Sequence, residues 1–249
     1  MSWAAQTMYG FDVESTGVDV FTDRIVTSTI TQVVPEGAGS PNSKQWLVNP
    51  GVPIPETATN VHGITDDMAA EGMAPAEAIE QIAHYVTWVL NQRLPLVAFN
   101  AAFDLSMLEA ECRRHDLTPL AERLTSHENW RSVIDPMVLG KGVDTIKNHR
   151  FVKGRKFTLP ALCEWYKVPF TETHDATADA LGAVGLARAI ADSDAYLGDM
   201  GPGALHQLQK TWRREMCHSL REYFDKNGIE HDGVDGGWPL HTQLQAVTA

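Results

Sequence analysis

The stretch FDVESTG, Phe11–Gly17, decides how this chain is interpreted. Residues 8–13 are β-rich, and the Ser, Thr and Gly that follow provide turn chemistry. Side chains alternate between the two faces of a strand, so the carboxylates of Asp12 and Glu14 project on the same side. Placing two negative charges together on a strand is costly unless they bind a cation or face solvent. The pair alone leaves both interpretations open.

The sequence around this stretch predicts a mixed α/β arrangement in the order βββαβα, followed by further helices. Alternating or continuous apolar runs indicate the strands, and apolar residues at 3.6-residue spacing indicate the helices. The predicted strands are 8–13, 24–34, 45–48 and 94–99. One predicted helix begins at Pro75, three more span 100–114, 158–166 and 176–191, and a last, amphipathic helix runs from Leu205 to about Phe224.

A change in composition at residues 192–204, rich in Asp, Ser, Gly and Pro, predicts a boundary. We therefore expect one domain over residues 1–191, and a linker, an amphipathic helix and an irregular tail over residues 192–249. The apolar stripe of that helix is typical of packing on a core or on a second subunit rather than of catalysis.

Overall composition excludes several classes of protein. The chain has 249 residues, of which 43% are hydrophobic, and a formal net charge of −12, which argues against a surface coated in positive charge. Its Cys112, Cys163 and Cys217 are widely spaced, so we expect buried thiols of a reducing compartment rather than disulfides or a zinc site. The N-terminus lacks signal-peptide features, and no apolar run reaches 18 residues. These features predict a cytoplasmic protein that does not cross a membrane.

Three motifs in this order resemble those of the DnaQ-like (DEDDh) 3′→5′ exonucleases, the family of the DNA polymerase III ε subunit and ribonuclease T. The first is FDVESTG; the second is FNAAFD, Phe99–Asp104, at a strand-to-helix turn; the third is HDATADA, His174–Ala180. The resemblance covers residues 7–191. It implies an RNase H-like fold, with a mixed five-stranded sheet flanked by helices and a C-terminal helical appendage.

The same resemblance assigns the catalytic groups. Asp12, Glu14, Asp104 and Asp179 would be the metal-binding carboxylates, and His174, five residues before Asp179, would be the general base. The implied cofactors are two Mg²⁺ ions, for which Mn²⁺ would substitute. Two cations neutralise the attacking and leaving oxygens of a phosphodiester, and hard oxygen ligands suit such ions. A neutral imidazole accepts the proton of the attacking water.

Two further acids are interpreted as structural. Asp175 is either a variable family position or, as we favour, the N-cap of the helix that follows it. Asp135, in Ile134-Asp135-Pro136, resembles a structural acid of the family and is not included among the metal ligands.

Substrate contacts are predicted at several small polar residues. Ser15, Thr16 and Gly17 offer backbone amides and hydroxyls to the terminal sugar and phosphate. Asn100 is either a turn former or a residue that positions the 3′-terminal nucleotide. His62, in the segment VHGIT, either lines the nucleotide pocket or belongs to a turn fixed by the following glycine.

A basic stretch at residues 141–156 carries six Lys and Arg residues against the single acid Asp144. It is either a solvated face or part of the path for the phosphate backbone. We favour the second interpretation and assign Lys153, Arg155 and Lys156 to substrate binding.

The sequence therefore predicts a metal-dependent 3′→5′ exonuclease that releases nucleoside 5′-monophosphates from single-stranded ends, with DNA favoured, acting in proofreading or repair. Its expected partners are single-stranded DNA or RNA 3′ ends and either a DNA polymerase or a second copy of the chain. The alternatives are an RNA-processing exonuclease of the same family and a non-catalytic nucleic-acid-binding module. A phosphoaspartate phosphatase is disfavoured, because Glu14 stands where its second Asp belongs and Gly203 stands where its later motif needs Asp.

Overall fold

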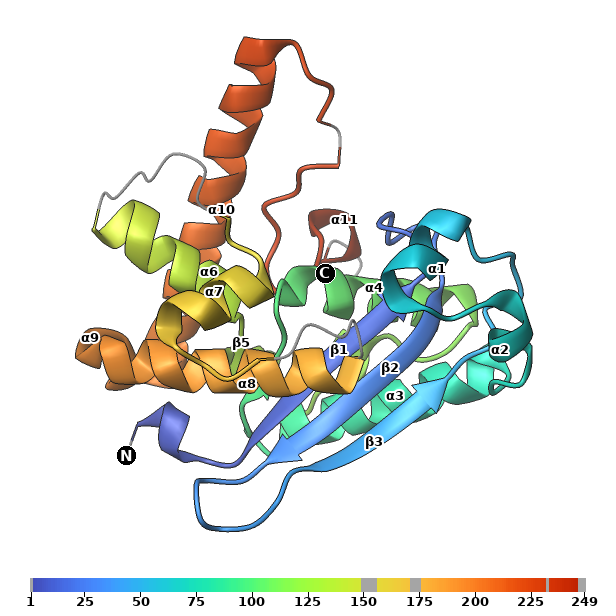
Figure 1. Cartoon of the computed structure of the whole chain (residues 1–249), viewed down its shortest axis with the longest axis horizontal. Helices are drawn as coiled ribbons and strands as arrows, with labels where there is room; N and C mark the ends of the chain where they lie inside the picture. The colour runs from blue at the N-terminus through green and yellow to red at the C-terminus, as the bar shows by residue number, and fades with distance from the viewer. Residues whose placement is uncertain (1, 149–155, 171–175, 232, 246–249) are drawn as a thin grey trace.

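A computed structural model describes residues 2–148, 156–170, 176–231 and 233–245, and it confirms a mixed five-stranded sheet flanked by helices (Figure 1). The strand order is β3-β2-β1-β4-β5. The first three strands are antiparallel, whereas β4 and β5 run parallel to β1. The strands are β1 (Met8–Ser15), β2 (Ile25–Val33), β3 (Asn42–Leu47), β4 (Leu96–Val97) and β5 (Val133–Ile134).

The register of the antiparallel strands aligns two rows of residues across the sheet. Asp12 of β1 pairs with Thr29 of β2, which pairs with Gln45 of β3. Glu14 pairs with Thr27, which pairs with Leu47. Because side chains in one row share a face, both acids lie on the same face as the threonines.

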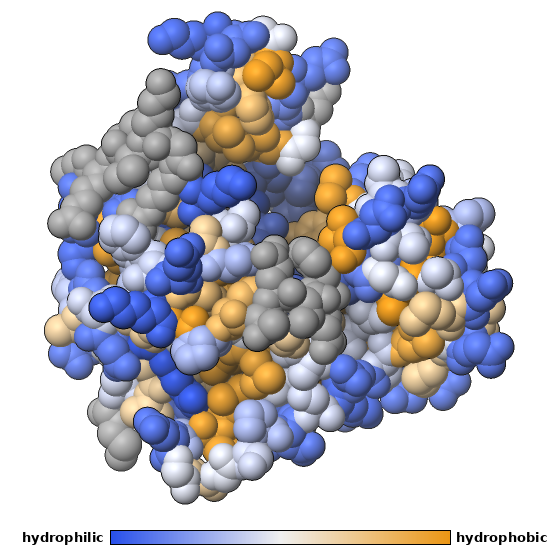
Figure 2. All heavy atoms as spheres, in the orientation of Figure 1, coloured by the Kyte–Doolittle hydropathy of each residue, from blue (hydrophilic) through white to orange (hydrophobic). Residues whose placement is uncertain are grey.

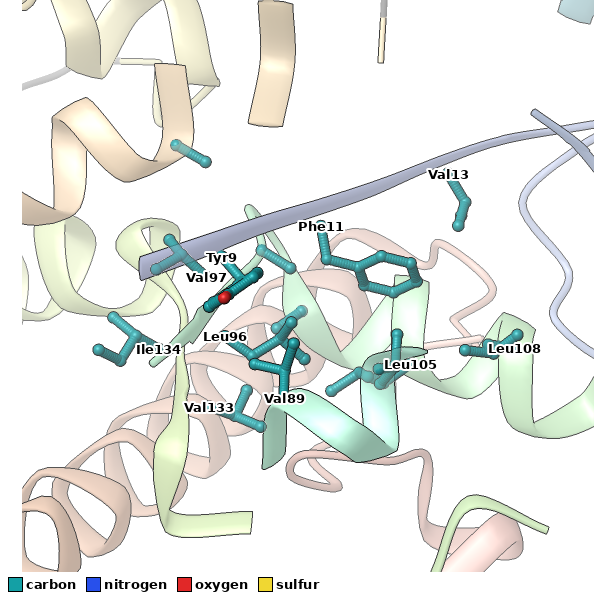
Figure 3. Close-up of a cluster of buried hydrophobic side chains, with 14 of the residues drawn as sticks. Tyr9, Phe11, Val13, Val89, Leu96, Val97, Leu105, Leu108, Val133 and Ile134 are labelled. Carbon is teal, nitrogen blue, oxygen red and sulfur yellow. The ribbon is translucent and has the colours of Figure 1, made fainter. Parts of the chain in front are cut away.

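The opposite face of β1 is apolar and covers the core. Figure 3 shows Phe11 and Val13 on the side of the strand where Leu105 and Leu108 of helix α4 (Ala101–Arg114) lie, and all four are buried. Helix α3 (Pro75–Asn91) packs on the same side. The acid-bearing face is covered by α8 (Ala176–Ser193), which crosses β1 and β2. The alternation of polar and apolar residues in FDVESTG therefore separates the site from the core.

The remaining helices surround this sheet. They are α1 (Glu56–His62), α2 (Asp66–Ala70), α5 (Leu120–Arg123), α6 (Pro136–Gly142), α7 (Leu159–Tyr166), α9 (Ala195–Gly198), α10 (Pro202–Asn227) and α11 (Thr242–Gln245), with shorter turns at Trp3–Ala5, His127–Ser132 and Val143–Lys147.

All four predicted strands have different bounds in the structure, and the third and fourth differ most. The fourth was predicted over residues 94–99, but β4 contains only Leu96–Val97. The Leu94 amide instead donates to Val89 O and closes helix α3, while Asn100 takes a left-handed conformation that begins α4. The third begins earlier than predicted, at Asn42, because its pairing with β2 extends to Gln32.

Helix α10 packs against the chain's own core along its first half. Leu205, Gln209 and Trp212 are buried. Further along, Leu220 and Tyr223 are 39% and 56% exposed, because this half of α10 projects away from the sheet (Figure 1). The apolar stripe predicted from Leu205 onward is thus buried only up to Cys217.

Two predictions from composition agree with the described residues. Cys112, Cys163 and Cys217 are buried free thiols. Within the described ranges, no helix has the length and apolar content needed to cross a membrane.

Candidate active site

Three carboxylates meet where β1 passes under α8. One oxygen each from Asp12, Glu14 and Asp179 lies within 4.8 Å of the others, and all three side chains are partly exposed. These are three of the four predicted metal ligands. Three hard oxygen donors at this spacing fit Mg²⁺ or Mn²⁺ rather than a softer ion.

A glycine in β1 lets α8 approach closely enough to complete the cluster. A Cβ on Gly10 would lie 2.5 Å from the carbonyl oxygen of Ala180, so the helix backbone rests directly on the strand. Gly10 is two residues before Asp12 and faces the same side. Since Ala180 follows Asp179, this contact sets the distance between Asp179 and the two acids of β1.

We expect Gly10→Ala to separate the cluster, because the clash is with backbone atoms that cannot rotate away. Overpacking of this kind costs about 1–3 kcal/mol of stability. Mn²⁺ affinity measured by calorimetry should fall roughly tenfold or more, equivalent to about 1.4 kcal/mol. The control is Gly201→Ala, where a Cβ meets nothing within 4 Å. Equal Mn²⁺ affinities for the two variants would contradict this role of Gly10.

Asp104, the fourth predicted ligand, lies beside the cluster rather than within it. It is 3% exposed, and its Oδ1 accepts a hydrogen bond from the Val13 amide at 3.1 Å. That amide faces β4, on the same side as the Tyr9 amide, which donates to Pro95 O. Strand β4 ends at Val97 and does not extend as far as Val13. The Asp104 carboxylate therefore accepts the hydrogen bond that a longer β4 would accept from the Val13 amide. Burial, with the nearby charges of Asp135 and Glu14, raises the pKa of Asp104 well above its usual range.

Asp135 has the structural role that the sequence suggested. It is fully buried and caps α6 by accepting from the Met137 and Val138 amides. It also accepts from the Asn100 amide at 3.1 Å and the Ala101 amide at 3.0 Å, which fixes the turn before α4. Burial raises the pKa of Asp135 to about 6.

This pKa predicts a stability loss as pH rises. Between pH 3.8 and about 6 the native state keeps the Asp135 proton while the unfolded chain releases it, so unfolding is favoured by up to roughly 3 kcal/mol at neutral pH. Asp135→Asn should flatten the decline of melting temperature between pH 4 and 6.5. Asp67→Asn, on exposed α2, is the control. Parallel pH curves for wild type and Asp135→Asn would contradict this assignment.

A pocket of about 400 Å³ adjoins the cluster on the β2–β3 side. Its volume falls in the range of sites for small ligands. It is lined by Glu14, Thr27, Ser28, Thr29, Gln45, Trp46, Leu47, His62, Ile64 and Ala176. Of these, the sequence analysis identified Glu14 and His62. Thr27, Thr29, Gln45 and Leu47 were missed, because only the register places them in the same rows as Asp12 and Glu14.

His62 is the last residue of α1, and a hydrogen bond defines which ring nitrogen carries its proton. Its Nδ1 accepts from the Ile64 amide at 3.0 Å, so the neutral ring carries its proton on Nε2. The His62 side chain is 9% exposed and its Nε2 is buried, with the backbone of Ser15 near enough to the ring to oppose the effect of burial on its pKa. Burial lowers the pKa of His62, which favours this neutral form. The left-handed Gly63 that follows ends the helix.

The hydroxyls of the first motif are used within its own loop. Ser15 Oγ donates to Gly17 O at 2.7 Å, and Thr16 Oγ1 donates to Asp23 Oδ1 at 2.8 Å. Gly17 leaves room for Asp23, whose carboxylate would overlap a Cβ there. The two hydroxyls therefore hold the turn, and the substrate contact predicted for Ser15, Thr16 and Gly17 remains a prediction.

The structure describes Asn100 but only part of the basic stretch. Asn100 is a turn residue with φ 67°, and its Oδ1 accepts from Arg213 Nη1 at 3.1 Å. In the basic stretch, Lys156 is exposed, whereas Lys147 is ion-paired with Asp194. His174, Asp175, Lys153 and Arg155 lie outside the described residues, so their assignments remain predictions.

The acidic cluster lies on the central strand of a mixed sheet of the RNase H-like class, next to a pocket of about 400 Å³. The sequence profile of the RNase T exonuclease family matches residues 9–187. The chain belongs to this exonuclease family, and the DnaQ-like resemblance of its three motifs is confirmed.

Relatives and solved structures agree with this assignment. PolC-type DNA polymerase III of Bacillus subtilis is 29% identical over 175 residues, 70% of this chain and 11% of that protein. An ε-like DNA polymerase III protein of Rhodobacter capsulatus is 37% identical over 103 residues, 41% of this chain and 14% of that protein. The chain thus spans only a small part of these relatives.

Among solved structures, one of exonuclease I matches with a TM-score of 0.63 and 20% identity, covering 78% of this chain and 42% of that one. Escherichia coli exonuclease I in complex with a dT13 oligonucleotide matches with a TM-score of 0.62 and 20% identity, covering 78% and 43%. These similarities show a shared fold.

Proposed function

We propose that this chain is a metal-dependent 3′→5′ exonuclease that hydrolyses single-stranded nucleic acid, DNA in preference to RNA, and releases nucleoside 5′-monophosphates. The observation that carries the proposal is the convergence of Asp12, Glu14 and Asp179 within 4.8 Å beside a pocket of about 400 Å³. A pocket of that size beside the acids favours capture of one terminal nucleotide over cleavage within a strand.

The chain's own residues would divide the work of hydrolysis. Asp12, Glu14 and Asp179 would hold two Mg²⁺ ions, with Asp104 the fourth proposed ligand. When bound, such ions neutralise the charge that develops on the phosphate oxygens and acidify water. His174 would accept the proton of the attacking water. Thr27 and His62, which line the pocket, would contact the terminal nucleotide.

The relatives support a role in DNA metabolism. The matched proteins include DNA polymerase III components, and a structure of similar fold holds a dT13 oligonucleotide. We therefore propose single-stranded DNA 3′ ends as the substrate, a DNA polymerase as a partner, proofreading or repair as the role and the cytoplasm as the location. An RNA-processing exonuclease is the alternative within the same family.

A cleavage panel tests the proposal. Purified protein is incubated with Mg²⁺ or Mn²⁺ and matched DNA and RNA oligonucleotides, single- and double-stranded, labelled at either end. Stepwise shortening of 5′-labelled single-stranded DNA, with release of 5′-monophosphates, is expected, and a chelator should stop it. Internal fragments would contradict exonuclease action, and faster shortening of RNA would favour the alternative.

A further inference from the structure

Two cationic side chains come from helices that pack against each other, because Lys141 precedes Gly142 and Arg213 follows Trp212, whose ring lies on Gly142. Arg213 of α10 donates through Nη1 to Asn100 Oδ1, and its Nε is buried without a hydrogen-bond partner among the described residues. Lys141, in the last turn of α6, is partly buried with Nζ 5.6 Å from the centre of the Phe157 ring. Across the described segments, neither cation forms an ion pair with a carboxylate.

These two cations repel each other. Burial lowers the pKa of Lys141, and the guanidinium of Arg213 lowers it further. Asp135, which is fully buried, is close enough to Arg213 for the guanidinium to oppose the rise in its pKa. The two cations thus face one buried acid, Asp135, and an anion would stabilise the second cation.

Packing fixes the position of this cation pair. Gln209, one turn before Arg213, accepts from the Asp135 amide at 2.7 Å and donates to Val133 O at 3.1 Å. The ring of Trp212 lies directly on Gly142 of α6. The pair is therefore held by the core contacts of α10 and α6, unlike lysines on long exposed side chains, and is preorganised to bind a ligand.

The strand order shows which part of a substrate would meet the pair. The pocket lies on the β2–β3 side of β1, and β1 carries Asp12 and Glu14. Asn100 and Asp135 follow β4 and β5, on the opposite side of β1. The surface is recessed between the part formed by α10 and the part formed by α1 (Figure 2). With a terminal nucleotide in the pocket and its phosphate at the acids, the preceding nucleotides would lie toward Arg213.

We propose that Arg213 and Lys141 bind a backbone phosphate of the single strand on the 5′ side of the bond to be cleaved. The inference rests on the proposed exonuclease function and gives α10 a substrate-binding role in addition to packing. A guanidinium and an ammonium suit a phosphodiester, since both donate charged hydrogen bonds to its oxygens.

Salt dependence of binding distinguishes this role from a structural one. Binding of a fluorescent dT12 oligonucleotide in Mg²⁺ is measured against salt concentration, in an Asp12→Asn background that prevents cleavage. Lys141→Gln combined with Arg213→Gln should weaken binding at least fivefold at low salt and reduce the slope of log affinity against log salt by about 0.7, the share of one phosphate on a single strand.

Controls separate charge from folding. Lys226→Gln removes an exposed charge from the same helix, roughly 20 Å further along it, and should leave the slope unchanged. Arg213→Lys keeps the charge and should keep most of the slope. Lys141→Gln alone removes one charge and leaves the hydrogen bond between Arg213 and Asn100 in place. A double variant with the slope of Lys226→Gln overturns the inference, as does weaker binding at an unchanged slope. If the parent neither binds dT12 nor, with Asp12 restored, cleaves it, the exonuclease proposal fails and this inference fails with it.

Discussion

Asp12→Asn should reduce hydrolysis of single-stranded DNA by roughly 10³-fold or more. Asp12 lies at the centre of the site, on β1 between Gly10 and Glu14 and under α8. A bound cation contributes several kcal/mol of charge stabilisation to phosphodiester cleavage, and each 1.4 kcal/mol is a factor of ten in rate. Loss of one carboxylate from a three-acid cluster should remove most of that stabilisation. Initial rates with a 5′-labelled oligonucleotide in Mg²⁺ provide the measurement.

The same variant should be more stable than the wild type when no metal is present. Three carboxylates within 4.8 Å repel one another, and Asn keeps the shape of the side chain without the charge. The metal-free melting temperature should therefore rise, and Mn²⁺ should raise it less than in the wild type. Asp67→Asn removes a charge from the exposed first turn of α2 and should match the wild type in rate. Near-normal hydrolysis by Asp12→Asn would show that the acidic cluster is not the catalytic centre.

His174→Ala should reduce kcat by about 10²–10⁴-fold, the usual contribution of a general base. A free imidazole has a pKa of about 6.5, and only its neutral form accepts a proton. The wild-type rate should therefore rise with pH through one ionisation, and the variant should lose that rise. His174 precedes Asp179 by five residues, and Asp179 begins the turn of α8 that completes the acidic cluster.

Metal binding separates a base from a ligand. Mn²⁺ affinity, measured by calorimetry, should stay within about threefold of the wild type in His174→Ala, whereas it should collapse in Asp12→Asn. His84→Ala, on the exposed face of α3, controls for loss of an imidazole. A variant that keeps the acid limb of the pH profile, or that loses Mn²⁺ binding, would show that His174 is not the base.

The sequence was sufficient for the parts of this protein that depend on local pattern. Alternation in FDVESTG placed Asp12 and Glu14 on one face and Phe11 and Val13 in the core, because a strand has a period of two. Periodic apolar residues located α3, α4, α7 and α8. Motif spacing gave the family, which the match over residues 9–187 confirms.

Two-residue strands and contacts between distant segments could not be predicted in this way. β5 was missed because Val133–Ile134 is too short to show a period, and it is a strand only because it pairs with β4. The pocket residues Thr27 and Gln45 carry no motif, and only the register of β1, β2 and β3 brings Thr27 beside Glu14 and Gln45 into the row of Asp12.

Tertiary packing also decided how individual groups are used. The sequence cannot show that Gly10 lets α8 approach the acids with Asp179. Nor can it show that Asp104 accepts a hydrogen bond from the Val13 amide. The contact between Arg213 of α10 and Asn100, 113 positions apart, is equally hidden from it. The sequence by itself determined which residue types and local conformations are present, because those depend on neighbours along the chain. Only the folded structure decided which carboxylates and cations meet, because charge, burial and distance depend on neighbours in space.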